Sequence, residues 1–307
     1  MEMFNTLKSF YQLWQYLKYL NNYDYDGLYR SIGIEAEGDY AIQTKYFNRG
    51  RQYVKSFGLL GLSFEKLLGR KLSEPEIKRI VLLAHFAPVY DDLFDRLDTA
   101  KDRIVKLIKT PENIKAVNAE EKLFLSFYLP VFRDLKTNDD FIGYFLKLTE
   151  AQEQSKQQTN GHLSYDEINQ ITRDKGGFSS LLLRSLINEQ MNENERAGLY
   201  QLGAMSQYMD DIFDWYDDLS ENRTTIANQL TLNELLELYQ TNFQALNKMQ
   251  FTETFKRLIS ILLSPASVCL DDYKKKQVNT KSRSQIRVIC DMEKPINQWN
   301  LFLKVAF

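Results

Sequence analysis

Two aspartate-rich stretches carry the clearest chemical signal in this chain: the first acidic motif (residues 91–95, DDLFD) and the second acidic motif (residues 210–214, DDIFD). Both follow the pattern DD-x-x-D and enclose an apolar pair. Further acids follow one turn later, Asp98 after the first motif and Asp217 and Asp218 after the second. Because helical residues three and four positions apart share a face, each motif and its extension would form a row of carboxylates.

Such rows are unfavourable unless something neutralises them. Like charges at i,i+4 destabilise a helix by about 0.2–0.5 kcal/mol per pair, and acids near a helix C-terminus oppose its dipole. Both motifs follow mostly apolar segments, residues 80–90 and 199–209, that we expect to be buried. Mg²⁺ is the natural counter-ion, since it binds a few carboxylates and completes its shell with water and phosphate oxygens; the plain alternative is a solvated acidic helix end. The predicted magnesium ligands are Asp91, Asp92, Asp95, Asp210, Asp211 and Asp214.

The elements that must position these motifs are helices. Glycine and proline are scarce in the 307 residues (13 and 6), and apolar residues recur at spacings of three and four. No shift in composition divides the chain, so we predict one all-α domain over residues 1–307. The predicted helices span residues 3–20, 40–68 with an interruption near Gly58 or Gly61, 73–98, 118–134, 139–158, 192–219, 232–248 and 251–276; an apolar run, 178–187, follows Gly176 and Gly177, and residues 296–307 form a last helix or strand.

Composition excludes several other classes of protein. Lys and Arg number 39 against 41 Asp and Glu, a net charge of −2, so no basic field exists to hold a nucleic acid. The two cysteines, Cys269 and Cys290, make no disulfide framework and indicate reduced thiols. No apolar stretch approaches the roughly 20 residues of a membrane span, and no signal peptide is recognisable. We therefore expect a cytoplasmic protein without a membrane span or a nucleic-acid partner.

The residues around the second acidic motif resemble a known family. Gly203, Gln207 and the motif itself fit G-x-x-x-Q-x-x-D-D-x-x-D, a pattern of the trans-prenyltransferase branch of the class I isoprenoid synthase superfamily. The resemblance covers about residues 46–229. It implies a helical bundle around a central cavity, several Mg²⁺ ions that bridge the acidic motifs and a prenyl diphosphate substrate, and a homodimer as in many relatives.

The resemblance also implies site residues. Residues 151–155 (AQEQS) stand where the family has G-Q-x-x-D, and residues 174–178 (DKGGF) stand where it has a Lys-Thr pair that opens a helix. Basic side chains would bind the diphosphate, and aromatic faces would stabilise a carbocation. The predicted catalytic residues are Asp91, Asp95, Asp210 and Asp214. The predicted substrate-binding residues are Gln152, Lys175, Phe178, Gln207, Arg223, Phe86 and Tyr90.

The chain departs from the elongating members of that family at two basic sites. No Arg-Arg-Gly follows the first acidic motif, and residues 49–51 (RGR) only partly match the family's G-K-R-x-R cluster. In those relatives such residues hold isopentenyl diphosphate, the second substrate. We therefore predict a terpene synthase, which ionises one allylic prenyl diphosphate. The alternatives are a prenyltransferase that extends or couples prenyl chains, a silent regulatory subunit, and an acidic Ca²⁺ scaffold, which the lack of an EF-hand-like loop disfavours.

Overall fold

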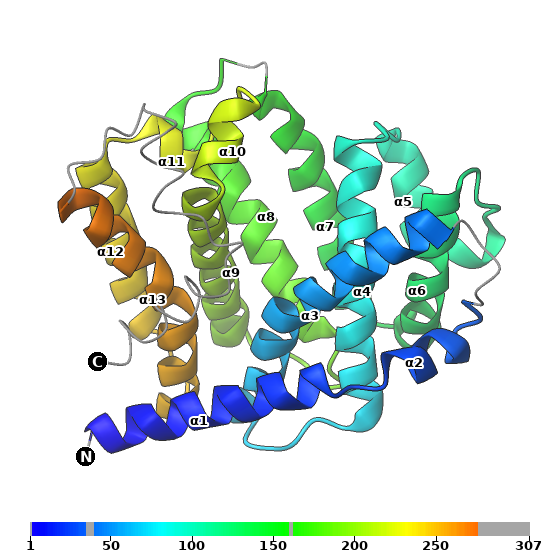
Figure 1. Ribbon diagram of the computed structural model, residues 1–307, viewed down its shortest axis with the longest axis horizontal. Coiled ribbons are helices and arrows are strands. Elements are labelled where there is room, and N and C mark those ends of the chain that lie inside the picture. Colours follow the sequence, from blue (N-terminus) through cyan, green and yellow to red (C-terminus); the bar gives the residue numbers. More distant parts are fainter. Residues whose placement is uncertain (1, 35–39, 160–161, 276–307) are drawn as a thin grey trace. The chain divides into compact units, whose positions relative to one another are not determined.

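A computed structural model describes residues 2–34, 40–159 and 162–275 (Figure 1). Within these ranges the regular structure is entirely helical, with thirteen α-helices and two short 3₁₀ helices and no strand. This confirms the predicted all-α class. No helix in the described ranges combines the length and the apolar character needed to cross a membrane.

The chain forms two compact units. Unit 1 comprises Met1–Phe10, Glu150–Leu181 and Met191–Phe307, and unit 2 comprises Tyr11–Thr149 and Leu182–Gln190. The first acidic motif belongs to unit 2 and the second to unit 1. That the whole chain is a single domain stays a prediction.

Unit 2 is organised around one almost wholly buried helix, α4. Its helices are α1, which begins in unit 1 (Glu2–Asn21), α2 (Tyr25–Ser31), α3 (Tyr40–Leu68), α4 (Glu74–Asp95), α5 (Lys101–Lys109), the 3₁₀ helix η1 (Pro111–Asn113), α6 (Ala119–Leu135) and the first part of α7 (Asp139–Ser155). A capping box of Ser73 and Glu76 starts α4, with Pro75 in its first turn. The helix then packs against α3 and α6. Its C-terminal end delivers the first acidic motif.

Unit 1 holds the second acidic motif on α9. Its helices are the end of α7, the 3₁₀ helix η2 (Lys156–Gln158), α8 (Tyr165–Ser185, ending in unit 2), α9 (Glu193–Phe213), α10 (Trp215–Ser220), α11 (Ile226–Gln229), α12 (Leu232–Asn247) and α13 (Glu253–Lys275). α9 packs against α12 and α13. The backbones of α9 and α8 approach closely at Gly203 and Gly176. A Cβ built on Gly203 would lie 2.0 Å from the carbonyl oxygen of Gly176, so only glycine fits there. Nearby, the Tyr200 hydroxyl donates to Asp174 at 2.6 Å.

Several predicted boundaries were wrong, and the two at the acidic motifs matter most. α4 ends at Asp95, and Asp98 has a left-handed φ of 44°, a conformation that Asp tolerates better than most residues. Asp98 therefore does not extend a helical row. α9 ends at Phe213, and Asp214 caps both α9 and α10. Five aspartates within nine residues lower helix propensity and repel each other, which fits a break at this point.

Other differences concern glycines and short elements. α3 runs without interruption through Gly58 and Gly61. α8 likewise continues through Gly176 and Gly177, so residues 174–178 lie inside a helix and do not open one. The short helix α2 was not predicted. Residues 296–307 and Cys290 lie outside the described residues.

Candidate functional site

Asp92 of the first acidic motif is surrounded by basic side chains of unit 2. Lys45 Nζ lies 2.7 Å from Asp92 Oδ2, and Arg49 Nη1 lies 2.7 Å from Oδ1. Arg96, one turn later, places Nε 3.0 Å from Oδ2, and the Tyr46 hydroxyl donates to the same oxygen at 2.7 Å. The Asp92 side chain is thus held by three cations and a phenol from α3 and the end of α4.

These contacts fix the charge state of Asp92. Only 8% of the surface of Asp92 is exposed to solvent, and burial alone would raise the pKa of its carboxyl group. Hydrogen bonds from Lys45, Arg49 and Tyr46 outweigh that penalty and hold the pKa of Asp92 well below its usual range. Asp92 is therefore ionised at neutral pH, with protein cations as its counter-ions.

The other two carboxylates of this motif have different surroundings. Asp91 is half-buried, and the Tyr53 hydroxyl donates to its Oδ2 at 3.3 Å. Asp95 is exposed at the last residue of α4. Arg96 also donates to Glu120 at 2.8 Å, so the basic cluster of Lys45, Arg49 and Arg96 is shared by two acids. We call this group the Asp92 cluster (Lys45, Tyr46, Arg49, Asp92, Arg96).

The second acidic motif gathers carboxylates with few basic partners. Asp211 is buried at 7% exposure; the Thr172 hydroxyl donates to its Oδ2 at 3.3 Å. Gln207 Nε2 donates to Asp210 Oδ2 at 2.8 Å and to Asp211 Oδ1 at 3.3 Å. Asp218, on α10, is buried at 9%, and the Nε atom of Arg223 lies 3.8 Å from its Oδ1. Neutral donors therefore provide most of the short contacts here.

The charge balance of this group is reversed relative to the first motif. Burial, followed by repulsion from Asp210, raises the pKa of Asp211 to about 6. Burial, followed by the charge of Asp211, raises the pKa of Asp218 to about 8. Desolvation, followed by repulsion from Asp210, raises the pKa of Asp214 to about 7. Asp210 and Asp214 keep exposed surface, whereas Asp211 and Asp218 are buried, and the ionised form is disfavoured in all four.

Two cations offset part of this excess of negative charge. The charges of Lys175 on α8 and Arg223 after α10 both lower the pKa of Asp210 against the dominant effect of desolvation. Arg223 is divided between acids, since its Nη2 also lies 3.3 Å from Glu221. We call the group of Asp210, Asp211, Asp214 and Asp218 the α9 carboxylate cluster. An added cation near these carboxylates would favour their ionised forms.

The donor chemistry of the α9 carboxylate cluster fits Mg²⁺. Carboxylate oxygens are its preferred protein ligands, and it keeps several waters while using one or two carboxylates and substrate phosphates. Across the described ranges, no three His, Cys, Asp or Glu side chains already converge into a ready-made metal site. Gln207 donates to Asp211, and the charge of Arg223 lowers the pKa of Asp214, so an amide donor and a guanidinium act on the same group of carboxylates.

The aromatic residues predicted to contact substrate lie in the interior of unit 2. Phe86 is 2% exposed and packs against Phe124, Tyr128 and Phe145 at ring-centroid distances of 5.5–5.8 Å. Tyr90 is equally buried, and its hydroxyl donates to Thr149 at 3.0 Å. These contacts suffice to explain both residues as core, and a substrate role for them stays a prediction.

The remaining predicted substrate residues belong to unit 1. Gln152 is buried on α7, at 4% exposure. Phe178 is half-buried on α8 and makes an edge-to-face contact with Tyr200 at 5.5 Å. Lys175 is half-buried on the same helix. Gly203 makes room for the backbone of α8.

Sequence reasoning missed part of each site. Arg96 is four residues after Asp92 on one helix face, a spacing that could have revealed the pair. Lys45 and Tyr46 could not be found in this way, because they reach Asp92 only through the packing of α3 on α4. Asp218 was noted as an extension but not as a member of the site, and Thr172 gave no signal at all.

No protein-family model matches the chain, and no curated protein matches it in sequence. The resemblance to isoprenoid synthases therefore rests on the motif residues themselves.

Proposed function

We propose that the protein is a Mg²⁺-dependent terpene synthase with a class I isoprenoid synthase fold, acting on an allylic prenyl diphosphate. The α9 carboxylate cluster is the observation that carries this proposal. Its buried carboxyls have raised pKa values and too few cationic partners, at a helix end where the sequence matches a diphosphate-binding motif. Cations that bridge to a diphosphate would relieve this excess charge.

Each group in the cluster has a defined task in this proposal. Asp210, Asp214 and the buried Asp211 and Asp218 would hold Mg²⁺. The metal, when bound, neutralises the diphosphate and makes it a better leaving group. Lys175 and Arg223 would share the negative charge of the departing diphosphate. Gln207 donates to both Asp210 and Asp211 and so orients the two carboxylates.

The first acidic motif has a divided role in the proposed reaction. Asp91 and Asp95 are the members that we assign to metal. Asp92 instead orients Lys45, Arg49 and Arg96, which it contacts within 3.0 Å. Its carboxylate already has strong positive partners, so binding a metal there would require displacing them.

Incubation of the purified protein with a panel of prenyl diphosphates tests the proposal. We expect a hydrocarbon or alcohol from a single allylic diphosphate, with turnover that requires Mg²⁺. Gas chromatography of the extract identifies the product. Absence of any product with every chain length, while Mg²⁺ still binds, would reject the enzyme and favour a silent regulatory subunit.

The Asp92 cluster favours a second candidate function, a trans-prenyltransferase. Three basic side chains beside an acidic motif are suited to binding the diphosphate of a second substrate such as isopentenyl diphosphate. The sequence suggested that such residues are missing, but packing brings Lys45, Arg49 and Arg96 together. In this second candidate function, Lys45, Arg49 and Arg96 would bind the diphosphate of isopentenyl diphosphate during the condensation reaction.

One pair of variants separates the two functions. Arg49 contacts Asp92, whereas Lys122 is an exposed basic residue of α6 outside the Asp92 cluster. If the enzyme condenses two substrates, Arg49→Gln should raise KM for isopentenyl diphosphate and Lys122→Gln should not. Product formation that ignores isopentenyl diphosphate, in the wild type and both variants, supports the terpene synthase.

A further inference from the structure

Helix α1 carries a row of large apolar side chains on its exposed face. The exposed fractions are 71% for Phe4, 48% for Leu7, 58% for Tyr11 and 47% for Trp14. These positions follow a spacing of three and four, so they form one stripe along the helix. We call it the α1 stripe (Phe4, Leu7, Tyr11, Trp14).

The opposite face of α1 already serves the core of unit 2. Leu13, Tyr16 and Leu20 are at most 5% exposed. The Tyr16 hydroxyl donates to Glu65 on α3 at 3.0 Å, and Leu20 lies against Gly58 of the same helix. The exposure of Tyr11 and Trp14 is therefore set by the packing of this part of α1 on α3, because rotating the helix to cover them would remove Leu13, Tyr16 and Leu20 from the core of unit 2.

The aromatic part of the stripe is held in place by its neighbours. The rings of Tyr11 and Trp14 stack at 5.8 Å with an angle of 24° between their planes. Lys18 Nζ lies 5.5 Å from the centroid of the Trp14 ring. An ordered Tyr–Trp–Lys row keeps one apolar surface next to one positive charge, an arrangement suited to an interface between water and a less polar phase.

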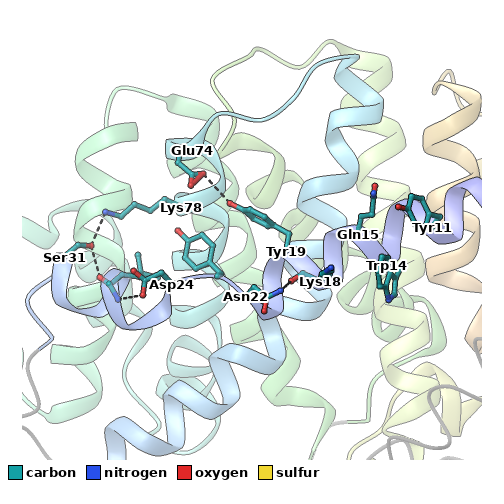
Figure 2. A pocket seen from close by; sticks show the side chains of 13 residues that line it. Tyr11, Trp14, Gln15, Lys18, Tyr19, Asn22, Asp24, Ser31, Glu74 and Lys78 are labelled. Atoms are coloured by element: carbon teal, nitrogen blue, oxygen red, sulfur yellow. Dashed lines mark hydrogen bonds between the residues drawn. The ribbon is translucent and has the colours of Figure 1, made fainter.

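The row continues into a shallow cleft of about 900 Å³ within unit 2 (Figure 2). Tyr11, Trp14 and Lys18 line one part of the cleft, together with residues of α2 and the start of α4. Farther along, the Tyr19 hydroxyl reaches Glu74 at 3.4 Å, and Lys78 Nζ donates to Ser31 at 3.2 Å. The cleft thus combines aromatic walls with a polar rim.

The charges of α1 have one sign over most of its length. Residues 3–23 contain no acid in a chain that has 41 of them, and both charged residues of this stretch, Lys8 and Lys18, are exposed. Asp24 and Glu74 border the far part of the cleft, beyond the stripe. An anionic partner would therefore meet only positive charge along the stripe itself.

We propose that the α1 stripe docks on the surface of a lipid bilayer that contains anionic headgroups. Trp and Tyr favour the headgroup level of membranes, and exposed lysines beside them are attracted to anionic lipid. A second copy of the chain is a poorer occupant, because two such faces would bring lysines together with no acid on either stripe. The inference is independent of the proposed reaction, since it needs neither Mg²⁺ nor a substrate.

Flotation with lipid vesicles, in the presence of EDTA, tests the docking. One set contains phosphatidylcholine alone, and the other contains about one third phosphatidylglycerol. We expect the protein to float with the anionic set, and the double substitution Tyr11→Ser with Trp14→Ser to weaken binding at least about tenfold, because apolar contact supplies much of the affinity. Val117→Ser is the matched control, since Val117 is 74% exposed away from α1.

Charge variants and solution size complete the test. Each of Lys8→Gln and Lys18→Gln should lower binding to anionic vesicles about fivefold, whereas Lys122→Gln, also exposed, should not. Circular dichroism establishes that the variants are folded. Equal flotation of the double variant and the wild type, or no flotation of the wild type, would overturn the proposal. A dimer in light scattering that the double variant abolishes, without vesicle binding, would assign the stripe to a second copy.

Discussion

Asp92 and Asp211 occupy equivalent positions in the two acidic motifs, and the structure predicts opposite effects for the same substitution. Asp211→Asn removes a buried carboxylate that is repelled by Asp210. Asp92→Asn removes the shared partner of Lys45, Arg49 and Arg96. In metal-free protein at pH 7, the first substitution should stabilise the fold and the second should destabilise it.

The size of the first effect follows from the raised pKa of Asp211. An unfolded Asp titrates near 3.8, whereas Asp211 in the folded protein titrates at about 6. Two pKa units correspond to about 3 kcal/mol, which the native state loses progressively as pH rises from about 4 to 6. Asp211→Asn should therefore recover up to about 3 kcal/mol at pH 7 and almost nothing near pH 4.

The second effect is smaller because the basic partners of Asp92 are partly solvated. The side chains of Lys45, Arg49 and Arg96 are 41%, 30% and 49% exposed. Solvent can therefore take over some of their stabilisation, and we expect Asp92→Asn to lower the free energy of unfolding by about 1–2 kcal/mol.

Urea denaturation in EDTA and in excess Mg²⁺ is the measurement. Saturating Mg²⁺ at about 100 times its Kd should stabilise the wild type by about 2.7 kcal/mol. Asp211→Asn should gain clearly less from the metal, since it has lost a ligand, whereas Asp92→Asn should gain as much as the wild type. A metal-free Asp211→Asn protein that is less stable than the wild type, or an equal gain from Mg²⁺ in both variants, would refute the charge balance derived for the two motifs.

Three further predictions concern activity, packing and pH. Asp91→Ala or Asp210→Ala should abolish turnover of a prenyl diphosphate with unchanged helicity by circular dichroism; full activity in either would show that the motif is not catalytic. Gly203→Ala should cost about 1–3 kcal/mol or more because α8 must move away, whereas Gly143→Ala, with open space around it, should be neutral or stabilising in the same thermal melts. Burial lowers the pKa of His85 to about 4, so its contribution to stability should fall by about 2 kcal/mol between pH 7 and pH 5; His85→Gln should lack this loss in urea titrations, and parallel curves would contradict it.

The His85 prediction rests on a well-defined environment in unit 2. Its Nδ1 lies 2.8 Å from the Val81 carbonyl oxygen, which can only accept, so Nδ1 carries the proton. Its Nε2 then accepts from the Tyr29 hydroxyl at 2.8 Å. Both nitrogens are satisfied in the neutral form, and the side chain is fully buried, so His85 is a core histidine.

Helical class and most helix positions could be predicted from the sequence because they depend on local features. Apolar spacing indicated α6, α12 and α13, and residue 73 was correctly predicted as the start of α4. Helix ends at the acidic motifs could not be placed, because repelling aspartates and a left-handed Asp98 do not alter the apolar pattern that predicts the helix.

The sequence by itself determined that two DD-x-x-D motifs follow buried apolar helix segments, and that no global charge favours a nucleic acid. Only the tertiary structure decided that the motifs differ. Asp92 is an ionised carboxylate paired with cations, because α3 packs on α4 and presents Lys45 and Arg49 to it. Asp211 and Asp218 are buried in unit 1 with fewer cationic partners. The pKa of a carboxyl depends on burial and on charges from other helices, and neither can be read from the spacing of residues along one helix.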